Sequence, residues 1–201
     1  ATWVNAADAA HAVPAPAVAP AMSTASAVPG FDSPAVDFEQ PFEMLKTCHG
    51  RVQRSLALLQ KLLAYVQTKW HDSQTQSAAK DVLRYFDLAA PLHHDDEELN
   101  IFPVVLAQGS ADAISAVATL LRDHQAMHAL WQRLREVLMV WSQPGATTPA
   151  SESMQALVAD FVASYASHIR TEEDLVYPQA RALMSAAQIA EISQQMRARR
   201  Q

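Results

Sequence analysis

The sequence predicts an all-α protein: an antiparallel up-and-down four-helix bundle with a short extra C-terminal helix and a disordered N-terminal arm. Two observations support this fold. Four long stretches repeat large apolar residues at intervals of three and four positions, which is the spacing of one helix face. The chain also has only 4 glycines in 201 residues, and modest connections join the stretches, as in a bundle of antiparallel neighbours.

The first 36 residues are expected to form the flexible arm, and residues 37–201 the bundle domain. The arm consists mostly of alanine, proline, valine and serine, as in "HAVPAPAVAPAMSTASAVPG". Such a stretch lacks the large apolar side chains that offset the entropy lost on ordering. Met22 opens "MSTASAVPG", which looks like a natural start, so residues 1–21 are either an upstream extension or derived from an expression vector.

The first two predicted helices follow the arm. The first runs from about Pro41, a residue suited to a first helical turn, to about Lys69. Its apolar face carries Leu45, His49, Val52, Leu56, Leu59 and Leu63. The second runs from about Ser73 to Leu99, and Pro91 should kink it just before a histidine. Its face carries Val82, Phe86, Ala89, His93 and Glu97.

A third helix is expected from about Ser110 to Trp141, and "SQPGATTP" breaks the chain after it. Its face carries Val117, Leu121, His124, His128, Trp131 and Leu138. The fourth helix begins near Pro149 and ends near Met184, and its face carries Phe161, Tyr165, His168, Glu172 and Leu175. A shorter helix from about Ala186 to Arg199 leads into "RARRQ", which we expect to be a solvated helix end.

Composition excludes several classes of function. A formal net charge of −6 argues against nucleic acid or anionic lipid as the main partner. No apolar run approaches the roughly 18 residues of a membrane span, and no segment has the basic start, apolar centre and cleavage site of a signal peptide. Cys48 is the single cysteine and cannot form an internal disulfide, which favours a reducing compartment. We therefore expect a soluble, cytoplasmic protein.

One pattern occurs twice. "HHDDEELNIFP" at 93–103 and "HIRTEEDLVYP" at 168–178 each begin with histidine, place a glutamate pair four and five residues later, and close on an aromatic residue and proline. Matching the closing prolines aligns His93 with His168 and Glu97 with Glu172, and further upstream His49 with His124. The first two helices should thus form one hairpin and the last two another, related by an approximate two-fold axis.

The polar residues of this repeat lie on the faces that should be buried. Buried imidazoles and carboxylates are costly without partners, and metal ions such as iron, manganese or zinc are natural partners for both. A glutamate four residues after a histidine lies one turn along the same face, so two such glutamates meeting between the hairpins would bridge two metals. The candidate ligands are His49, His93, Glu97, His124, His128, His168 and Glu172.

The repeat is broken at one position. His128 follows His124 by four residues, whereas its counterpart in the first hairpin is Gln53, a poor ligand. One metal would receive three histidines and the other only His49 and His93. With two shared glutamates and a bridging oxygen, the first metal would have six ligands and the second five. The vacant position of the second metal would be where a small molecule binds.

These residues resemble the hemerythrin-like proteins, the HHE cation-binding family, over roughly residues 41–182. The motifs that carry the resemblance are "CHG" at 48–50, "RDHQAMH" at 122–128 and the two repeated segments. The resemblance implies that the seven candidate residues hold two iron ions, joined by an oxo or hydroxo bridge, although other divalent metals suit the same donors. It also implies that dioxygen or a related small molecule binds at the less crowded iron.

The roles of four residues near the expected ligands stay open. Oxygen-carrying hemerythrins place the last carboxylate five residues after its histidine, which here is Glu173, while the internal repeat favours Glu172. His94 and Glu98 lie beside the ligand face and are expected to support the site from outside or to face solvent. Tyr165, one turn from His168, either packs in the core, which is the favoured interpretation, or forms a hydrogen bond with bound oxygen or supplies electrons to it.

The leading functional hypothesis is a binding protein, a non-haem di-iron protein that binds or senses dioxygen, rather than an enzyme. The first alternative is an oxidase, a peroxidase or a nitric-oxide-handling enzyme that uses the same open position. The others are iron storage or delivery, and a bundle that binds no metal. The sequence shows no flavin-binding or rubredoxin-like segment, no cysteine-bearing domain and no fused output domain, so a redox or signalling partner would be a separate molecule.

Overall fold

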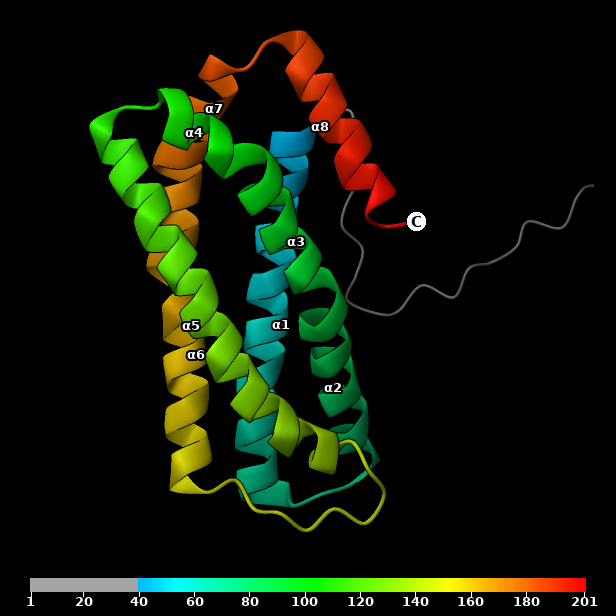
Figure 1. Ribbon diagram of the computed structural model, residues 1–201. Helices are drawn as coiled ribbons and strands as arrows, with labels where there is room; N and C mark the ends of the chain where they lie inside the picture. The colour runs from blue at the N-terminus through cyan, green and yellow to red at the C-terminus, as the bar shows by residue number, and fades with distance from the viewer. Residues whose placement is uncertain (1–39) are drawn as a thin grey trace, which may run out of the picture. The chain divides into compact units, whose positions relative to one another are not determined.

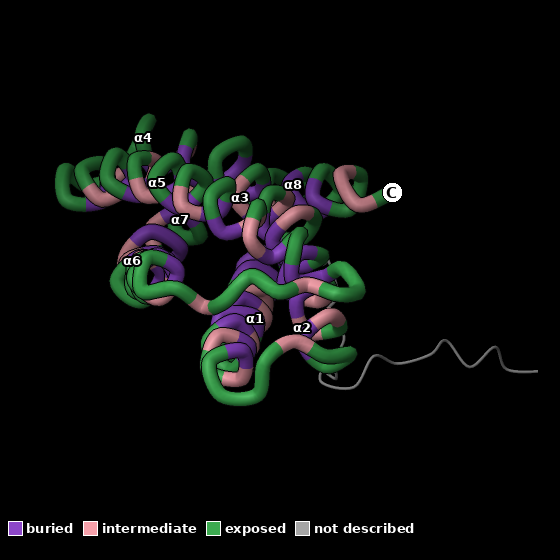
Figure 2. The backbone as a smooth tube through the Cα atoms, turned by 90° about the horizontal axis from the view of Figure 1, so that it is seen from below, coloured by how far each residue is buried: buried purple, intermediate pink, exposed green. Residues whose placement is uncertain are grey.

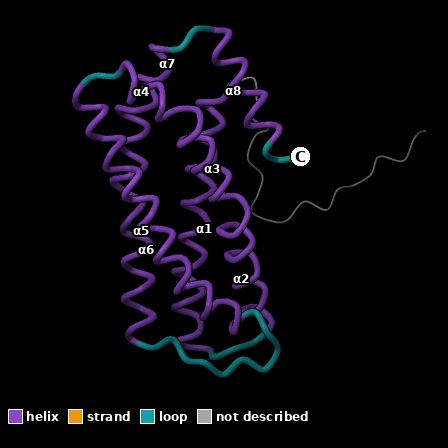
Figure 3. Tube along the Cα trace, viewed as in Figure 1, coloured by secondary structure: helices purple, strands orange, loops and turns teal. Residues whose placement is uncertain are grey.

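The computed structural model describes residues 40–201, which form helices and no strand (Figure 3). The arm expected at residues 1–36 lies outside this range, so the domain boundary stays a prediction. Within residues 40–201, no helix combines the length and the apolar composition that a membrane crossing would require.

The described residues form an antiparallel four-helix bundle with an extra C-terminal helix, which confirms the predicted fold class (Figure 1). The first hairpin joins α1 to a second, interrupted helix. Its segments are α1 (Pro41–Lys69), α2 (Ser73–Arg84), η1 (Tyr85–Ala89), α3 (Ala90–Asp96), η2 (Glu97–Ile101) and α4 (Phe102–Gln108). The second hairpin and the final helix follow, with segments α5 (Ala111–Trp141), α6 (Glu152–Thr171), η3 (Glu172–Val176), α7 (Tyr177–Leu183) and α8 (Ala186–Ala198).

Helix ends agree with the sequence except in the second and fourth helices. The second continues to Gln108, beyond the expected end at Leu99, and the fourth begins at Glu152 rather than near Pro149. Ser151 explains the later start, because its hydroxyl accepts a hydrogen bond from the Met154 amide and caps the helix.

Three π-helical turns interrupt the second and fourth helices, and the sequence analysis did not anticipate them. Each turn, η1, η2 and η3, ends one residue before an X–Pro pair. A proline inside a regular helix lacks an amide hydrogen and collides with the carbonyl four residues earlier. The wider π turn removes the conflict, because the amide before each proline bonds to the carbonyl five residues back, as Phe102 does to Glu97 and Tyr177 to Glu172.

Two apolar clusters form the core, and the bundle turns its buried positions inward (Figure 2). One cluster includes Leu59, Phe86, Trp131 and Phe161, and the other includes Leu45, Phe102, Leu120 and Tyr177. On every long helix, the chain passes from one cluster to the other across the repeated histidine and glutamate positions. A buried polar layer therefore lies between two apolar ones.

The C-terminal helix α8 covers the first hairpin where this layer lies. Ile192 and Met196 join the second apolar cluster. Arg199 and Arg200 each bind one oxygen of the fully buried Asp96 carboxylate at 2.6 Å. The expectation that "RARRQ" is a solvated helix end is therefore wrong for these two arginines, because a buried carboxylate one residue before Glu97 requires cationic partners.

Candidate metal centre

Six of the seven residues predicted as ligands are buried together in the polar layer. They are His49, His93, Glu97, His124, His168 and Glu172, and the two glutamates are 0% exposed. Each glutamate is the first residue of a π turn, η2 or η3, and the preceding α-helical turn carries a histidine of the same hairpin. The proline that closes each repeat thus enforces a wide turn at the glutamate.

The first group of donors consists of His49, His93, Glu97 and Glu172, whose ligand atoms all lie within 4.8 Å of one another. Nε2 of His49 lies 3.1 Å from Oε2 of Glu172. Nε2 of His93 lies 3.4 Å from Oε1 of Glu97. Two imidazoles from the first hairpin therefore meet one carboxylate from each hairpin.

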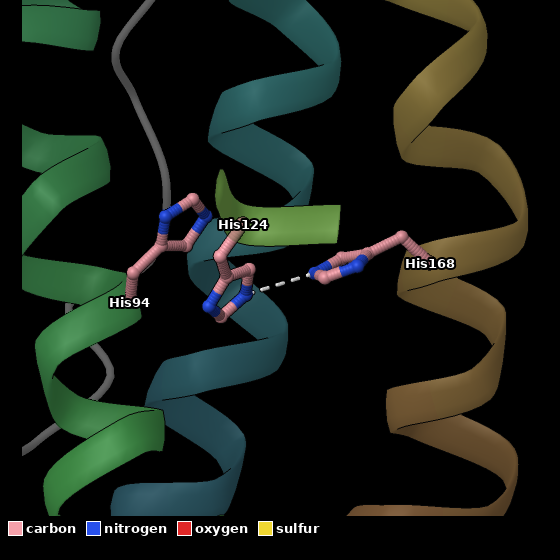
Figure 4. Close-up of side chains that lie close together, drawn as sticks. All are labelled: His94, His124 and His168. Carbon is pink, nitrogen blue, oxygen red and sulfur yellow. Dashed lines mark hydrogen bonds between the residues drawn. The ribbon is translucent and has the colours of Figure 1, made fainter. Parts of the chain in front are cut away.

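The second group consists of three imidazoles, His94 from α3, His124 from α5 and His168 from α6 (Figure 4). The rings of His94 and His124 are stacked, with centroids 3.8 Å apart. Nε2 of His168 lies 2.9 Å from Oε1 of Glu172, and Nε2 of His124 lies 3.5 Å from Oε2 of Glu97.

The two carboxylates join the two groups. Glu97 directs one oxygen to His93 and the other to His124. Glu172 directs one oxygen to His49 and the other to His168. Each carboxylate therefore presents one oxygen to each group, which is the arrangement that a pair of bridging carboxylates requires.

Two of the predicted positions lie elsewhere. His128 belongs to neither group: its side chain is exposed, and its Nε2 accepts a 3.4 Å hydrogen bond from Gln132. His94 from the opposite hairpin takes its place beside His124. Glu173, the alternative to Glu172, lies outside the layer and binds the outer nitrogen of His49.

Carboxylates hold the outer nitrogens of three imidazoles. Nδ1 of His49 donates to Glu173 at 2.7 Å, and Nδ1 of His124 donates to Glu98 at 2.6 Å. Nδ1 of His168 lies 3.3 Å from Asp123. Such contacts fix the tautomer and leave the inner nitrogen of each ring as a donor for a metal.

The two strong contacts cross between the hairpins. Glu98 of the first hairpin holds His124 of the second, and Glu173 of the second holds His49 of the first. The doubled glutamates of the sequence therefore divide their roles: the first of each pair faces the centre and the second orients a histidine. The repeat contains this signal, although the sequence analysis did not draw a pairing from it.

Tyr177 is a further site residue that the sequence analysis missed. Its hydroxyl donates to Oε1 of Glu97 and lies 3.3 Å from Nε2 of His49. The repeat places Phe102 at the equivalent position of the first hairpin, and the Phe102 ring stacks on His124. The first group of donors therefore has a phenol hydroxyl beside it, and at the equivalent position the second group has a phenyl ring without a hydroxyl.

Burial and neighbouring charges set the protonation of this layer. Burial raises the pKa of Glu97 well above its usual range, and the charge of Glu172 adds to this effect. Burial acts in the same direction on Glu172, but His124, His168 and His49 outweigh it and hold its pKa well below the usual range. Burial, together with the charge of His49, lowers the pKa of His93 to about 3, so this imidazole is neutral.

These donors suit a metal better than they suit one another. Nε2 of His124 and Nε2 of His168 lie 3.1 Å apart, while the outer nitrogens of both rings face carboxylates. Two inner lone pairs that face each other need a shared proton or a cation. Within residues 40–201, Oε2 of Glu97 and both oxygens of Glu172 are also buried without a hydrogen-bond donor. A bound cation would be a partner for these oxygens.

Comparison with known proteins gives an independent view. The family model described as the Hemerythrin HHE cation binding domain matches residues 40–180, which contain the whole polar layer but not α8. A Haemophilus influenzae protein described as an uncharacterized protein is 31% identical over 164 residues, covering 82% of this chain and 92% of that protein.

Proposed function

Because the chain belongs to the hemerythrin HHE cation-binding family, we propose that its polar layer holds two iron ions and binds or senses dioxygen or a related small molecule. The observation that carries the proposal is the pair of buried glutamates, each with one oxygen directed to each imidazole group. Manganese and zinc would suit the same donors.

The first iron would be held by His49 and His93, the second by His94, His124 and His168, and Glu97 and Glu172 would contribute carboxylate oxygens to both. His128, the third histidine that the sequence predicts, is the alternative to His94. Two iron ions held in this way would supply a redox-active site at which a small molecule such as a diatomic can bind reversibly.

The chain's own residues would stabilise the bound state in three ways. Glu173, Glu98 and Asp123 would keep the inner nitrogens of three histidines facing the metals. The Tyr177 hydroxyl would hold the orientation of Glu97. The apolar clusters on both sides of the layer would exclude water, which slows the loss of charged products.

The space at the centre limits the bound molecule to a small one, which an oxidase, a peroxidase or a nitric-oxide-handling enzyme would also use, so these enzymes remain the alternative function. The cavity beside His49, His93 and Glu172 measures about 10 Å³, which is the volume that one water-sized molecule needs. A substrate larger than a diatomic or triatomic molecule would not fit there.

Metal analysis and visible absorption test the proposal on the full chain. The protein is reconstituted with iron under anaerobic conditions, and its iron content and absorption are recorded before and after exposure to dioxygen. Two irons per chain and an oxygen-dependent spectrum that persists for minutes would support reversible binding. Rapid bleaching with turnover of peroxide would favour the enzyme, and a chain that retains no iron would contradict the metal centre itself.

A further inference from the structure

The two halves of the repeat also differ at a position next to the centre. Tyr165 on α6 lies one turn before His168, and the equivalent residue one turn before His93 is Ala90 on α3. Both are buried. A methyl group therefore stands where the other hairpin has a phenol, and the missing volume leaves space between α3 and α6.

This space consists of two adjoining cavities. The inner cavity, of about 10 Å³, reaches His49, His93, His168 and Glu172. The outer cavity, of about 70 Å³, opens toward the surface. Ala90, His94 and Tyr165 line both cavities. These three side chains are thus the wall between the surface pocket and the first group of donors.

The lining of the outer cavity favours the entry of a neutral molecule over that of an ion. Besides the three shared residues, it is lined by Phe86, Pro91, Met127, His128 and Trp131. The carboxylate of Asp87, which contacts Trp131, accepts hydrogen bonds from the Trp131 indole N–H and the Arg135 guanidinium, each at 3.0 Å. An ion would have to give up its water to enter, whereas an apolar diatomic molecule would not.

We propose that the passage walled by Ala90, His94 and Tyr165 is the access route by which a neutral diatomic molecule reaches the iron held by His49 and His93. This inference rests on the proposed function and adds the route to it. Tyr165 lines both cavities, which places its side chain along the passage. The repeat accounts for the opening on this side of the centre, because Ala90 takes the place that Tyr165 has in the other hairpin.

Filling the passage tests the route. In Ala90→Leu, added side-chain volume should close the wall without removing a donor. The probe is nitric oxide, mixed with the reduced, iron-loaded protein in a stopped-flow spectrometer. Association and dissociation should both slow by about tenfold or more, because a narrower route raises the barrier in both directions. The dissociation constant should stay unchanged.

The matched control is Ala78→Leu, which fills a separate pocket of about 180 Å³ between α1 and α2. Ala78 precedes His93 by 15 residues, which corresponds to roughly 22 Å along a helix. This variant should bind nitric oxide at the rates of the natural chain. If Ala90→Leu folds, carries as much iron as the natural chain and binds nitric oxide equally fast, the proposed route is wrong.

A second measurement does not depend on iron or on that variant. Crystals of the metal-free natural chain are pressurised with xenon, a neutral apolar probe of cavities. Xenon should occupy the outer cavity beside Ala90 and Tyr165, and the milder variant Ala90→Val should reduce its occupancy. Absence of xenon there would overturn the route. Xenon bound in a chain that retains no iron would instead leave the passage in place and contradict the proposed function.

Discussion

Glu173 on η3 accepts a 2.7 Å hydrogen bond from Nδ1 of His49 on α1, across the interface between the two hairpins. Glu98 and His124 repeat this contact in the opposite direction at 2.6 Å. In each pair, the second glutamate of one hairpin holds the outer ring nitrogen of a histidine from the other hairpin. Assembly of the bundle therefore orients the histidines.

Replacing Glu173 by alanine should weaken metal binding by about 10- to 100-fold, because His49 loses the contact that fixes its tautomer and ring orientation. Iron affinity is measured by competition with a chelator of known affinity. The control is Asp174→Ala, which removes the exposed neighbouring carboxylate. Equal losses in both variants would show that the charge of the segment matters and the His49 contact does not.

His94→Ala should reduce the iron content from two toward one per chain, because His94 stands with His124 and His168 in the second group. His128→Ala should leave the iron content unchanged, since His128 is exposed and bonded to Gln132. Metal analysis of both reconstituted variants decides between them. The reverse result would return the third imidazole to His128, the residue that the spacing in α5 predicts.

Tyr177→Phe should lower the unfolding free energy of the metal-free protein by roughly 1–3 kcal/mol, because a buried oxygen of Glu97 loses its donor. Denaturant unfolding measures the change. Tyr65→Phe is the comparison, since it removes a hydroxyl bonded to the exposed Asp72 and should cost less. If the two substitutions cost the same, the Tyr177 contact contributes nothing specific to the site.

The ion pairs of Arg199 and Arg200 on the C-terminal segment with Asp96 of the first hairpin should contribute several kcal/mol to the unfolding free energy. The double variant Arg199→Gln with Arg200→Gln leaves the Asp96 carboxylate buried without these cations, and should destabilise the protein by about 3–5 kcal/mol. Adding Asp96→Asn should recover part of the loss by removing the buried charge. Arg181→Gln, which breaks the exposed pair with Glu43, should cost less than about 1 kcal/mol. Denaturant unfolding of all three variants provides the measurement. A double variant as stable as the natural chain would show that the ion pairs with Asp96 do not stabilise the fold.

His93 should contribute stability to the metal-free protein that is lost as the pH falls from about 6.5 toward 3. The pKa of His93 is about 3 in the folded protein and rises to its ordinary value near 6.5 on unfolding. Between these values the unfolded chain binds one proton more, so stability increases with pH by at most about 1.4 kcal/mol per pH unit from this group. Unfolding curves at pH 4, 5, 6 and 7, in the presence of a chelator, measure the slope. His93→Gln should reduce it, and an equal slope in the variant would assign the effect to other groups.

Much of the fold followed from local patterns. The spacing of apolar residues predicted four long helices, and Pro41, Lys69 and Trp141 lie at helix ends as expected. Propensity and periodicity act within one helix, which is why a single sequence suffices for them. The π turns were missed because they depend on hydrogen bonds five residues apart at X–Pro pairs, a geometry that leaves no distinct apolar pattern.

The sequence by itself determined which residue types repeat, on which helix faces they lie, and hence that His49, His93, Glu97, His124, His168 and Glu172 would converge. Only the tertiary structure decided which partner each one meets. Helix spacing places His128 one turn from His124, yet His94 of the other hairpin stacks on His124 and His128 faces outward. The same holds for Glu98, Glu173 and Arg199, whose partners lie on other helices. Periodicity fixes a residue's direction around its own helix axis, but the rotation and offset of neighbouring helices are set by the packing of all their side chains at once.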